Sequence, residues 1–254
     1  MSWAARRRFL IFVIIGVVIV AFGVIIFFAT IYQSPSCSDG TQNQGEQGID
    51  CGGSCAYLCT EQQQPPTVLY TKAIQNTNGR TDVVASIENK NATAAARNVP
   101  YRITLYGAGQ SLIQQVTGTL DLPPGATIPI YIPGILSGKQ TVTNEFLDIS
   151  ADAPHWFTLA TDPRIVPTVS NIALGGTLLM PRIEALLTNP TIPALTNVRV
   201  VVVVHGLNGN VIAASQTIVP TVPAQGQAGA TFTWNAPFAS APAAIEVVPI
   251  IPLP

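Results

Sequence analysis

The chain has 254 residues, enough for a membrane anchor and two domains of about 100 residues each. Only 10% of the residues are charged, 48% are hydrophobic, and the net charge is −1. Beyond residue 33 the chain carries 9 basic and 13 acidic residues and shows no basic patch, so we expect no nucleic-acid partner.

An uncharged apolar run of 24 residues, 9–32, directly follows three arginines, Arg6 to Arg8. A helix of this length spans about 36 Å, which is enough to cross a hydrocarbon core of about 30 Å. Because the next basic residue is Lys72, we expect residues 1–8 in the cytoplasm, one transmembrane helix over 9–33, and the rest outside. The alternative is a cleaved secretory signal, which has a shorter apolar core and small residues at its cleavage site. The prediction is a single-pass protein of the cell membrane.

All four cysteines, Cys37, Cys51, Cys55 and Cys59, lie in one glycine-rich segment, 34–60. This segment has too few apolar side chains to bury a core, and disulfides persist on the outer side of a membrane. We therefore predict two disulfides, with all three pairings open. Zinc is the alternative, although the spacing C-x13-C-x3-C-x3-C lacks the usual C-x2-C pair.

Four side chains with oxygen atoms, Asp39, Asn43, Glu46 and Asp50, lie between glycines in the same segment. Calcium binds oxygen ligands on a tightly turning backbone, so these residues are a candidate calcium site. The EF-hand pattern does not fit, and we prefer the hypothesis that these side chains stabilise turns. No cofactor is therefore expected, and calcium is the alternative.

This segment resembles a cysteine module of bacterial and some archaeal surface proteins, C-x-D-G-x-x-N-x-G-E-x-G-x-D-C-G-G-x-C-x-x-x-C. The matching residues are Cys37, Asp39, Gly40, Asn43, Gly45, Glu46, Gly48, Asp50, Cys51, Gly52, Gly53, Cys55 and Cys59. The resemblance implies a location at the cell surface and no particular activity.

Residues 61–66 form a polar linker that ends in prolines, and short strands with turn signals follow it. The alternation of apolar and polar residues at 68–74 and 99–106 predicts an antiparallel β-sandwich over 67–160. Pro100, Pro129 and Pro133 suit edge strands or bulges, because proline cannot donate to a ladder.

The strand pattern repeats about 100 residues later, which predicts a second sandwich over 161–254. Asn89 corresponds to Asn189, residues 98–107 to 197–206, and residues 126–132 to 230–236. The unbroken valine run 200–204 predicts a central strand that is buried on both faces. The predicted fold is therefore all-β, with two tandem antiparallel immunoglobulin-like β-sandwiches after a transmembrane helix and a small disulfide module.

The strands resemble the FxLYD-type immunoglobulin-like domain through Leu105, Tyr106, Pro124 and Gly125, and again through Asn189 and residues 232–238. Gly107 stands where that family shows an aspartate. Residues 9–254 together resemble uncharacterised single-pass surface proteins of small-genome, candidate-phyla bacteria, a resemblance that brings no activity with it.

We expect no enzyme, because no motif for nucleophilic, metal or phosphate chemistry is present in the sequence. His155 and His205 are predicted to pack or to form hydrogen bonds, and Trp156 and Trp234 to pack in cores or at the domain junction. Asn91 begins an N-x-[ST] glycosylation sequon.

These patterns favour a membrane-anchored structural or binding protein of the cell envelope, whose partner is another surface protein. The alternative is an accessory subunit of a membrane-bound secretion or surface-appendage assembly, and a surface hydrolase is the remote alternative.

Overall fold

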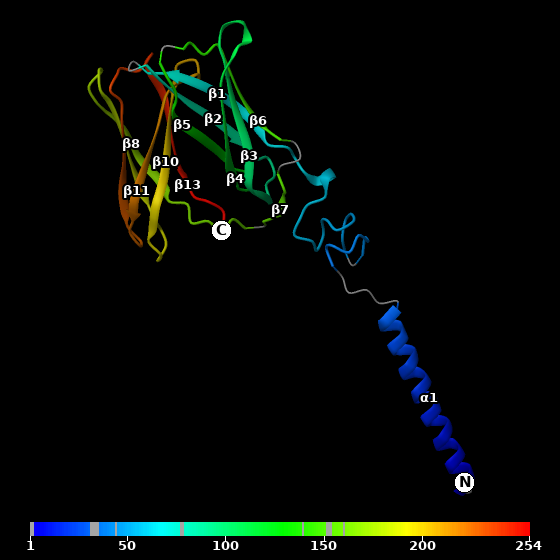
Figure 1. Cartoon of the computed structure of the whole chain (residues 1–254). Coiled ribbons are helices and arrows are strands. Elements are labelled where there is room, and N and C mark those ends of the chain that lie inside the picture. Colours follow the sequence, from blue (N-terminus) through cyan, green and yellow to red (C-terminus); the bar gives the residue numbers. More distant parts are fainter. Residues whose placement is uncertain are drawn as a thin grey trace. The chain divides into compact units, whose positions relative to one another are not determined.

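The computed structural model describes residues 3–30, 36–43, 45–76, 79–138, 140–150, 154–159 and 161–254. Residues 31–35, which end the predicted span and begin the predicted cysteine segment, lie outside this description. Helix α1, Trp3–Thr30, contains the apolar run (Figure 1). Its stretch from Arg6 to Thr30 is long and apolar enough to cross a membrane, and none of that window is buried by the protein. Both a membrane anchor and a signal sequence have this length and composition.

The cysteine segment is an irregular chain closed by the two predicted disulfides. The bridges join Cys37 to Cys55 and Cys51 to Cys59, which decides the pairing that the sequence left open. Each bridge encloses one cysteine of the other, so the two loops interlock. Contacts divide the protein into two compact units, Met1–Cys59 and Thr60–Pro254.

The second unit begins with a short 3-10 helix, Thr60–Gln62, followed by an ordered linker. The backbone N–H of Gln64 donates to the Asn91 side chain at 2.9 Å, and the Asn91 amide donates to the Gln64 carbonyl at 2.8 Å. Two hydrogen bonds in opposite directions, both between Gln64 and Asn91, therefore hold the predicted linker against the first sandwich.

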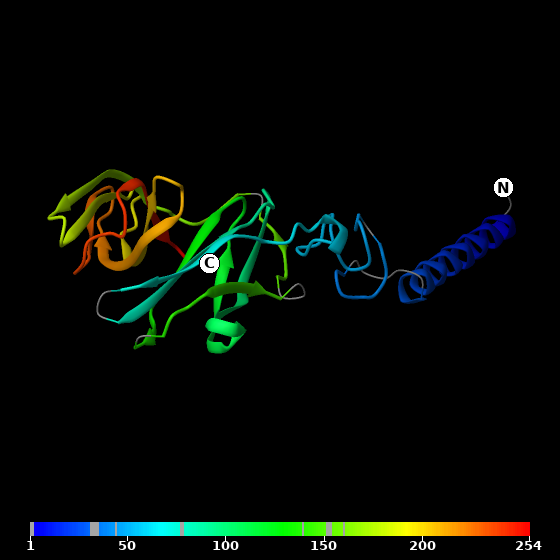
Figure 2. The same cartoon turned by 90° about the horizontal axis from the view of Figure 1, so that it is seen from above.

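The first sandwich has two antiparallel sheets, ordered β1-β2-β5 and β4-β3-β6, with β7 paired to the start of β3 (Figures 1 and 2). Its strands are β1 Thr67–Gln75, β2 Arg80–Glu88, β3 Ala94–Tyr106, β4 Leu112–Leu122, β5 Thr127–Ser137, β6 Asn144–Ile149 and β7 Phe157–Thr158, with a 3-10 turn at Ala108–Gln110. Pro129 and Pro133 lie in edge strand β5, and Pro100 follows the bulge between Ala96 and Val99, as predicted.

The second sandwich repeats this topology in the sheets β12-β9-β8 and β11-β10-β13. Its strands are β8 Thr168–Gly176, β9 Pro181–Thr188, β10 Leu195–Gly206, β11 Val211–Val222, β12 Gln227–Thr233 and β13 Pro242–Ile250. The predicted domain boundary lies in the loop between β7 and β8. The mostly β fold with antiparallel sheets, an apolar amino-terminal helix and disulfides is therefore the predicted one.

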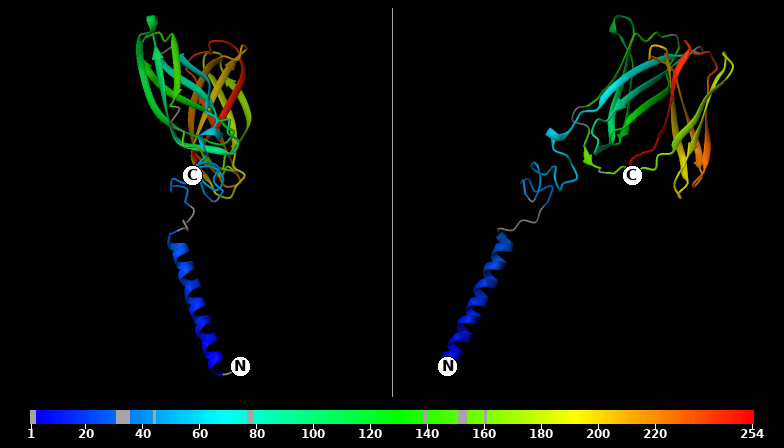
Figure 3. Two further views of the ribbon diagram at one scale, coloured as in Figure 1. Left: turned by 90° about the vertical axis from the view of Figure 1, so that its right-hand side faces the viewer. Right: turned by 180° about the vertical axis from the view of Figure 1, so that it is seen from behind.

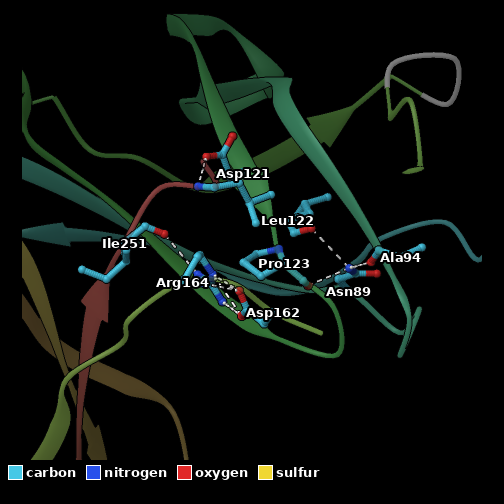
Figure 4. Close-up of polar contacts among 9 residues, drawn as sticks. Asn89, Ala94, Asp121, Leu122, Pro123, Asp162, Arg164 and Ile251 are labelled. Atoms are coloured by element: carbon cyan, nitrogen blue, oxygen red, sulfur yellow. Dashed lines mark hydrogen bonds and ion pairs between the residues drawn. The ribbon is translucent and has the colours of Figure 1, made fainter. Parts of the chain in front are cut away.

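A buried asparagine holds the same loops together in each sandwich. The Asn89 amide donates to the carbonyls of Ala94 (2.8 Å) and Pro123 (2.7 Å), as Figure 4 shows. The Asn189 amide donates to the carbonyls of Pro193 (2.8 Å) and Pro223 (3.1 Å). These matching contacts agree with the predicted correspondence of the two asparagines.

One predicted correspondence is wrong. The Asn89 N–H donates to the Ala126 carbonyl and the Asn189 N–H to the Gly226 carbonyl, so Ala126 corresponds to Gly226, not to Ala230. The alignment relied on the Ala-Thr sequence that occurs in both segments. The correspondence of the strands is instead set by their backbone pairing, which does not align these two Ala-Thr pairs.

The two sandwiches pack face to face through non-corresponding sheets, β1-β2-β5 of the first and β11-β10-β13 of the second (Figure 3). In β10, Val200, Val202 and Val204 point into the core of the second sandwich. The alternate residues Val201 and Val203 pack against Val84 of β2. The valine run is therefore buried on both faces as predicted, and its second face is covered by the other sandwich.

Each sandwich also has a sheet that corresponds to the contact sheet of the other sandwich. The outer face of that sheet carries polar residues where the contact sheet carries apolar or aromatic ones. In the second sandwich the positions of Val84 and Tyr131 are occupied by Glu184 and Thr231. In the first sandwich the positions of Val201 and Ala214 are occupied by Arg102 and Gln115. Stacked repeats keep their terminal faces polar in the same way.

Candidate binding cleft

The carboxylates of the predicted calcium site hold the backbone of their own loop. Asp50 accepts N–H bonds from Asp39 (2.9 Å) and Gly40 (2.9 Å), and Glu46 accepts one from Asn43 (3.3 Å). These contacts are those of the turn-stabilising hypothesis.

Asp39 takes part in the same turns. Its carboxylate accepts hydrogen bonds from the Thr41 hydroxyl (2.7 Å) and the Asn43 amide (2.9 Å), and these bonds lower the pKa of Asp39. Calcium binding by this segment stays a hypothesis, and an ion would have to compete with these hydrogen bonds for the same oxygens.

Glu46 also lies beside sulfur atoms. Its carboxylate and the sulfurs of Cys37 and Cys55 form a compact group with metal-ligand chemistry. The two sulfurs are bonded to each other, and a disulfide sulfur is not the thiolate that zinc requires. The oxidised segment therefore lacks the thiolates that the zinc alternative needs.

Of the four residues predicted to pack or to form hydrogen bonds, Trp156, Trp234 and His205 are found in such roles. Trp156 is buried, and the Trp234 ring packs edge-on against Phe238 at 5.1 Å. His205 contacts the Gly209 carbonyl through Nδ1 at 3.2 Å, whereas His155 is exposed.

The Asn91 amide is held between Gln64 and Asn89 and is only 7% exposed. A folded chain does not offer this nitrogen to a glycosylating enzyme, so the sequon is concealed.

A cleft of about 500 Å³ opens between the two sandwiches, a volume within the range of small-ligand sites. Both apolar and polar side chains line it, and they are called here its floor and its rim. The floor residues are Ile128, Ile130, Val201 and Ile250. The rim residues include Asn98, Tyr101, Asp121, Tyr131, Arg164, Asn197, Arg199 and Gln216.

The carboxyl-terminal tail contributes Ile251 and Pro252 to the lining of the cleft, and Figure 4 shows Ile251 in contact with Arg164. The Asp121 carboxylate accepts the Leu253 N–H at 2.8 Å and the Asn98 N–H at 2.9 Å. Because Asp121 belongs to β4 and Leu253 follows β13, this carboxylate links the two sandwiches. Both of its oxygens are occupied by backbone donors.

The Arg164 guanidinium is occupied in a similar way. It donates to the Ile251 carbonyl at 3.1 Å and forms an ion pair with Asp162 at 2.7 Å. The hydrogen bonds from Arg164 hold the pKa of Asp162 below its usual range. The positive charge of Arg164 is thus neutralised before it reaches the cleft.

Arg199 on the rim differs from Asp121 and Arg164, whose charged groups are occupied by contacts within the protein. No carboxylate of the described part of the chain forms an ion pair with its exposed guanidinium. Burial raises the pKa of the Tyr101 phenol, and the nearby charge of Arg199 opposes this rise. The phenol is therefore protonated at neutral pH and offers a hydrogen-bond donor beside an uncompensated positive charge.

Two corresponding asparagines complete the rim. Asn98 and Asn197 both have left-handed backbones, with φ of 50° and 52°, a conformation that asparagine tolerates better than most residues. Asn98 lies in the bulge where the pairing of β3 with β4 shifts between Ala96 and Val99, whereas Asn197 lies between Thr196 and Val198 in the regular pairing of β10 with β11. The two corresponding positions therefore both contribute an asparagine to the lining of one cleft.

An exposed apolar hairpin lies elsewhere on the second sandwich. The turn between β8 and β9 presents Leu178, Leu179 and Met180, which are 91%, 69% and 60% exposed. The neighbouring side chains Ile172 and Leu174 border a shallow groove against β13. Solvated turns normally use glycine, asparagine, aspartate or proline, so three large apolar residues make this turn unusual.

Sequence reasoning named none of the cleft residues as a site. Arg199 and Tyr101 carry no motif, and they lie 98 positions apart in the chain. The one available signal was the Asn-Val pair that recurs in both corresponding strands, at 98–99 and 197–198.

Comparison with known proteins identifies no relative. No protein-family model matches the chain, and no curated protein matches it. Among solved structures it is similar to red sea bream transglutaminase, at 14% identity and a TM-score of 0.24. That match covers 68% of this chain and only 27% of the enzyme.

Proposed function

We propose that this chain is a membrane-anchored, extracytoplasmic protein of the cell envelope, in which the fused sandwiches form a rigid binding body without enzymatic activity. The observation that carries the proposal is the unburied apolar helix α1 in a chain whose other compact unit builds its cores without it. Exposed apolar surface on this scale favours burial in lipid. The three arginines before the helix favour a cytoplasmic amino terminus.

The binding role is supported by the cleft between the sandwiches. Its walls come from both sandwiches, and the Asp121–Leu253 contact and the valine interface fix those walls relative to each other. A cleft with fixed walls needs little ordering when a ligand binds, which favours affinity. No described histidine lines it, and its one carboxylate, Asp121, accepts a backbone N–H group on each oxygen, so the hydrolase alternative has no free histidine or carboxylate base there.

The test is a topology measurement on the full chain with a carboxyl-terminal epitope tag. Protease added to intact cells should remove the tag, and the chain should stay with the membrane after an alkaline carbonate wash. Amino-terminal sequencing should find α1 retained. A tag that stays protected, or a chain released from the membrane with α1 removed, would refute the proposal.

The exposed hairpin favours a second candidate, an accessory subunit that packs permanently on a membrane-bound partner. The corresponding turn of the first sandwich, Asn76 to Gly79, is polar in sequence, so the duplicated fold itself does not require an apolar turn. Permanent subunit interfaces bury apolar side chains of this kind.

The two candidates differ in the behaviour of one variant. If the chain is a permanent subunit, it should sediment in mild detergent as a complex with its partner. Leu179→Asp should then dissociate that complex. Leu207→Asp is the matched control, because Leu207 is 82% exposed in another turn of the same sandwich. Sedimentation as a single copy before any substitution would favour the first candidate.

A further inference from the structure

We infer that the cleft between the sandwiches binds a carboxylate carried on a small apolar body, with Arg199 and Tyr101 holding the carboxylate. This inference deepens the binding role proposed above and rests on it. The charge, the donors and the floor of the cleft each contribute to the choice of ligand.

The charge balance selects an anion. Three charged side chains line the cleft, namely Asp121, Arg164 and Arg199. Asp121 is satisfied by two backbone N–H groups, and Arg164 is neutralised by Asp162. Arg199 is left as the charge without a counter-charge among the described residues. A guanidinium in this state pairs best with a carboxylate, which it can engage with two parallel hydrogen bonds.

A carboxylate that is bound by Arg199 has further lone pairs, and these can accept a hydrogen bond from the neighbouring Tyr101 hydroxyl. The Tyr101 hydroxyl makes no hydrogen bond with any described group, and its proton is retained at neutral pH. The Tyr101 ring lies against Gly118, the residue directly opposite on β4, where a side chain would collide with the hydroxyl end of the ring. Gly118 therefore sets the position of the phenol at the rim.

The floor decides what carries the carboxylate. Ile128, Ile130 and Ile250 contribute branched aliphatic side chains to the lining of the cleft, and Ile128 and Ile130 are each 8% exposed. A polyhydroxylated sugar would lose water there without regaining hydrogen bonds, whereas an aliphatic group would gain. The carboxyl-terminal residue of a peptide and a short fatty acid both have this chemistry.

The experiment compares two probes that differ only in charge, using the full chain in detergent micelles. N-acetyl-leucine offers a carboxylate on an aliphatic body, and N-acetyl-leucinamide offers the same body without the charge. We expect the acid to bind at least about tenfold more tightly than the amide when binding is followed by NMR titration. Octanoate, titrated in parallel, separates a peptide end from an acyl chain as the preferred source.

Substitutions then locate the site. Arg199→Gln should remove the preference for the acid, and Tyr101→Phe should weaken acid binding severalfold while leaving the ring in place. Arg102→Gln is the matched control, because Arg102 is exposed on β3 and does not line the cleft. It should leave acid binding unchanged.

Two outcomes overturn the inference. One is equal affinity for the acid and the amide. The other is acid binding that survives in a folded Arg199→Gln variant, with folding checked by an unchanged thermal transition. Because neither result bears on membrane topology, the failure of this inference can be told apart from the failure of the proposed function.

Discussion

The face-to-face contact of the sandwiches predicts that residues 60–254 unfold as one cooperative unit, and Val203→Ala tests this. Val203 is fully buried in the interface cluster. Removing its two methyl groups costs about 1.6 kcal/mol of transfer free energy, and the remaining cavity raises the loss to about 2 kcal/mol. For a unit of this size, a loss of about 2 kcal/mol lowers the transition temperature by about 4–8 °C.

The assay is differential scanning calorimetry of the full chain in detergent. Wild type should show one transition for the β body, and Val203→Ala should move that whole transition downward. Thr231→Ala is the control, because Thr231 is exposed at the position that corresponds to interface residue Tyr131, and its effect should stay within about 0.5 kcal/mol. Two separate transitions, or a Val203→Ala effect as small as the control, would show that the sandwiches are independent.

Three further predictions concern the repeat, the interface and the disulfides. Replacing Asn189 by alanine should cost about 2–4 kcal/mol, because two buried carbonyls lose their donor, and Asn89→Ala should cost a similar amount in chemical denaturation. Burial and a nearby carboxylate raise the pKa of Tyr70 from 10.0 to about 12, so stability should hold below pH 10 and fall as the pH rises towards 12. Tyr70→Phe should make that alkaline decline shallower, and an unchanged decline would contradict the assignment. Replacing Cys51 and Cys59 together by serine opens a loop of 8 residues and should remove about 2.5 kcal/mol from the cysteine segment, seen as faster proteolysis there with an unchanged β-body transition.

In the cysteine segment, the sequence predicted that disulfides form but did not predict which cysteines pair. Four cysteines among glycines predicted covalent closure, because so little apolar surface cannot offset the entropy of ordering. The choice of Cys37 with Cys55 depended on how the loop folds over the carboxylates of Asp50 and Glu46, and no spacing rule contains that information.

In the duplicated sandwiches, too, the sequence predicted local features but not long-range ones. Alternation at 99–106 and the valines at 200–204 predicted strands, since the period of two is a local property of the chain. The alignment of β5 with β12 failed because it relied on letters rather than on the backbone pairs that set the register. Asn91 shows a related limit, since the sequon is visible in the sequence and its burial is not.

The sequence by itself determined an apolar helix, a disulfide segment and two all-β repeats, because hydrophobic length, cysteine density and strand alternation each act over a few neighbouring residues. Only the tertiary structure decided which sheets meet. The second buried face of β10 is covered by β2, more than 100 residues earlier in the chain. That long-range contact creates the cleft and brings Tyr101 and Arg199 together, because a site shared by two domains exists only once they have packed.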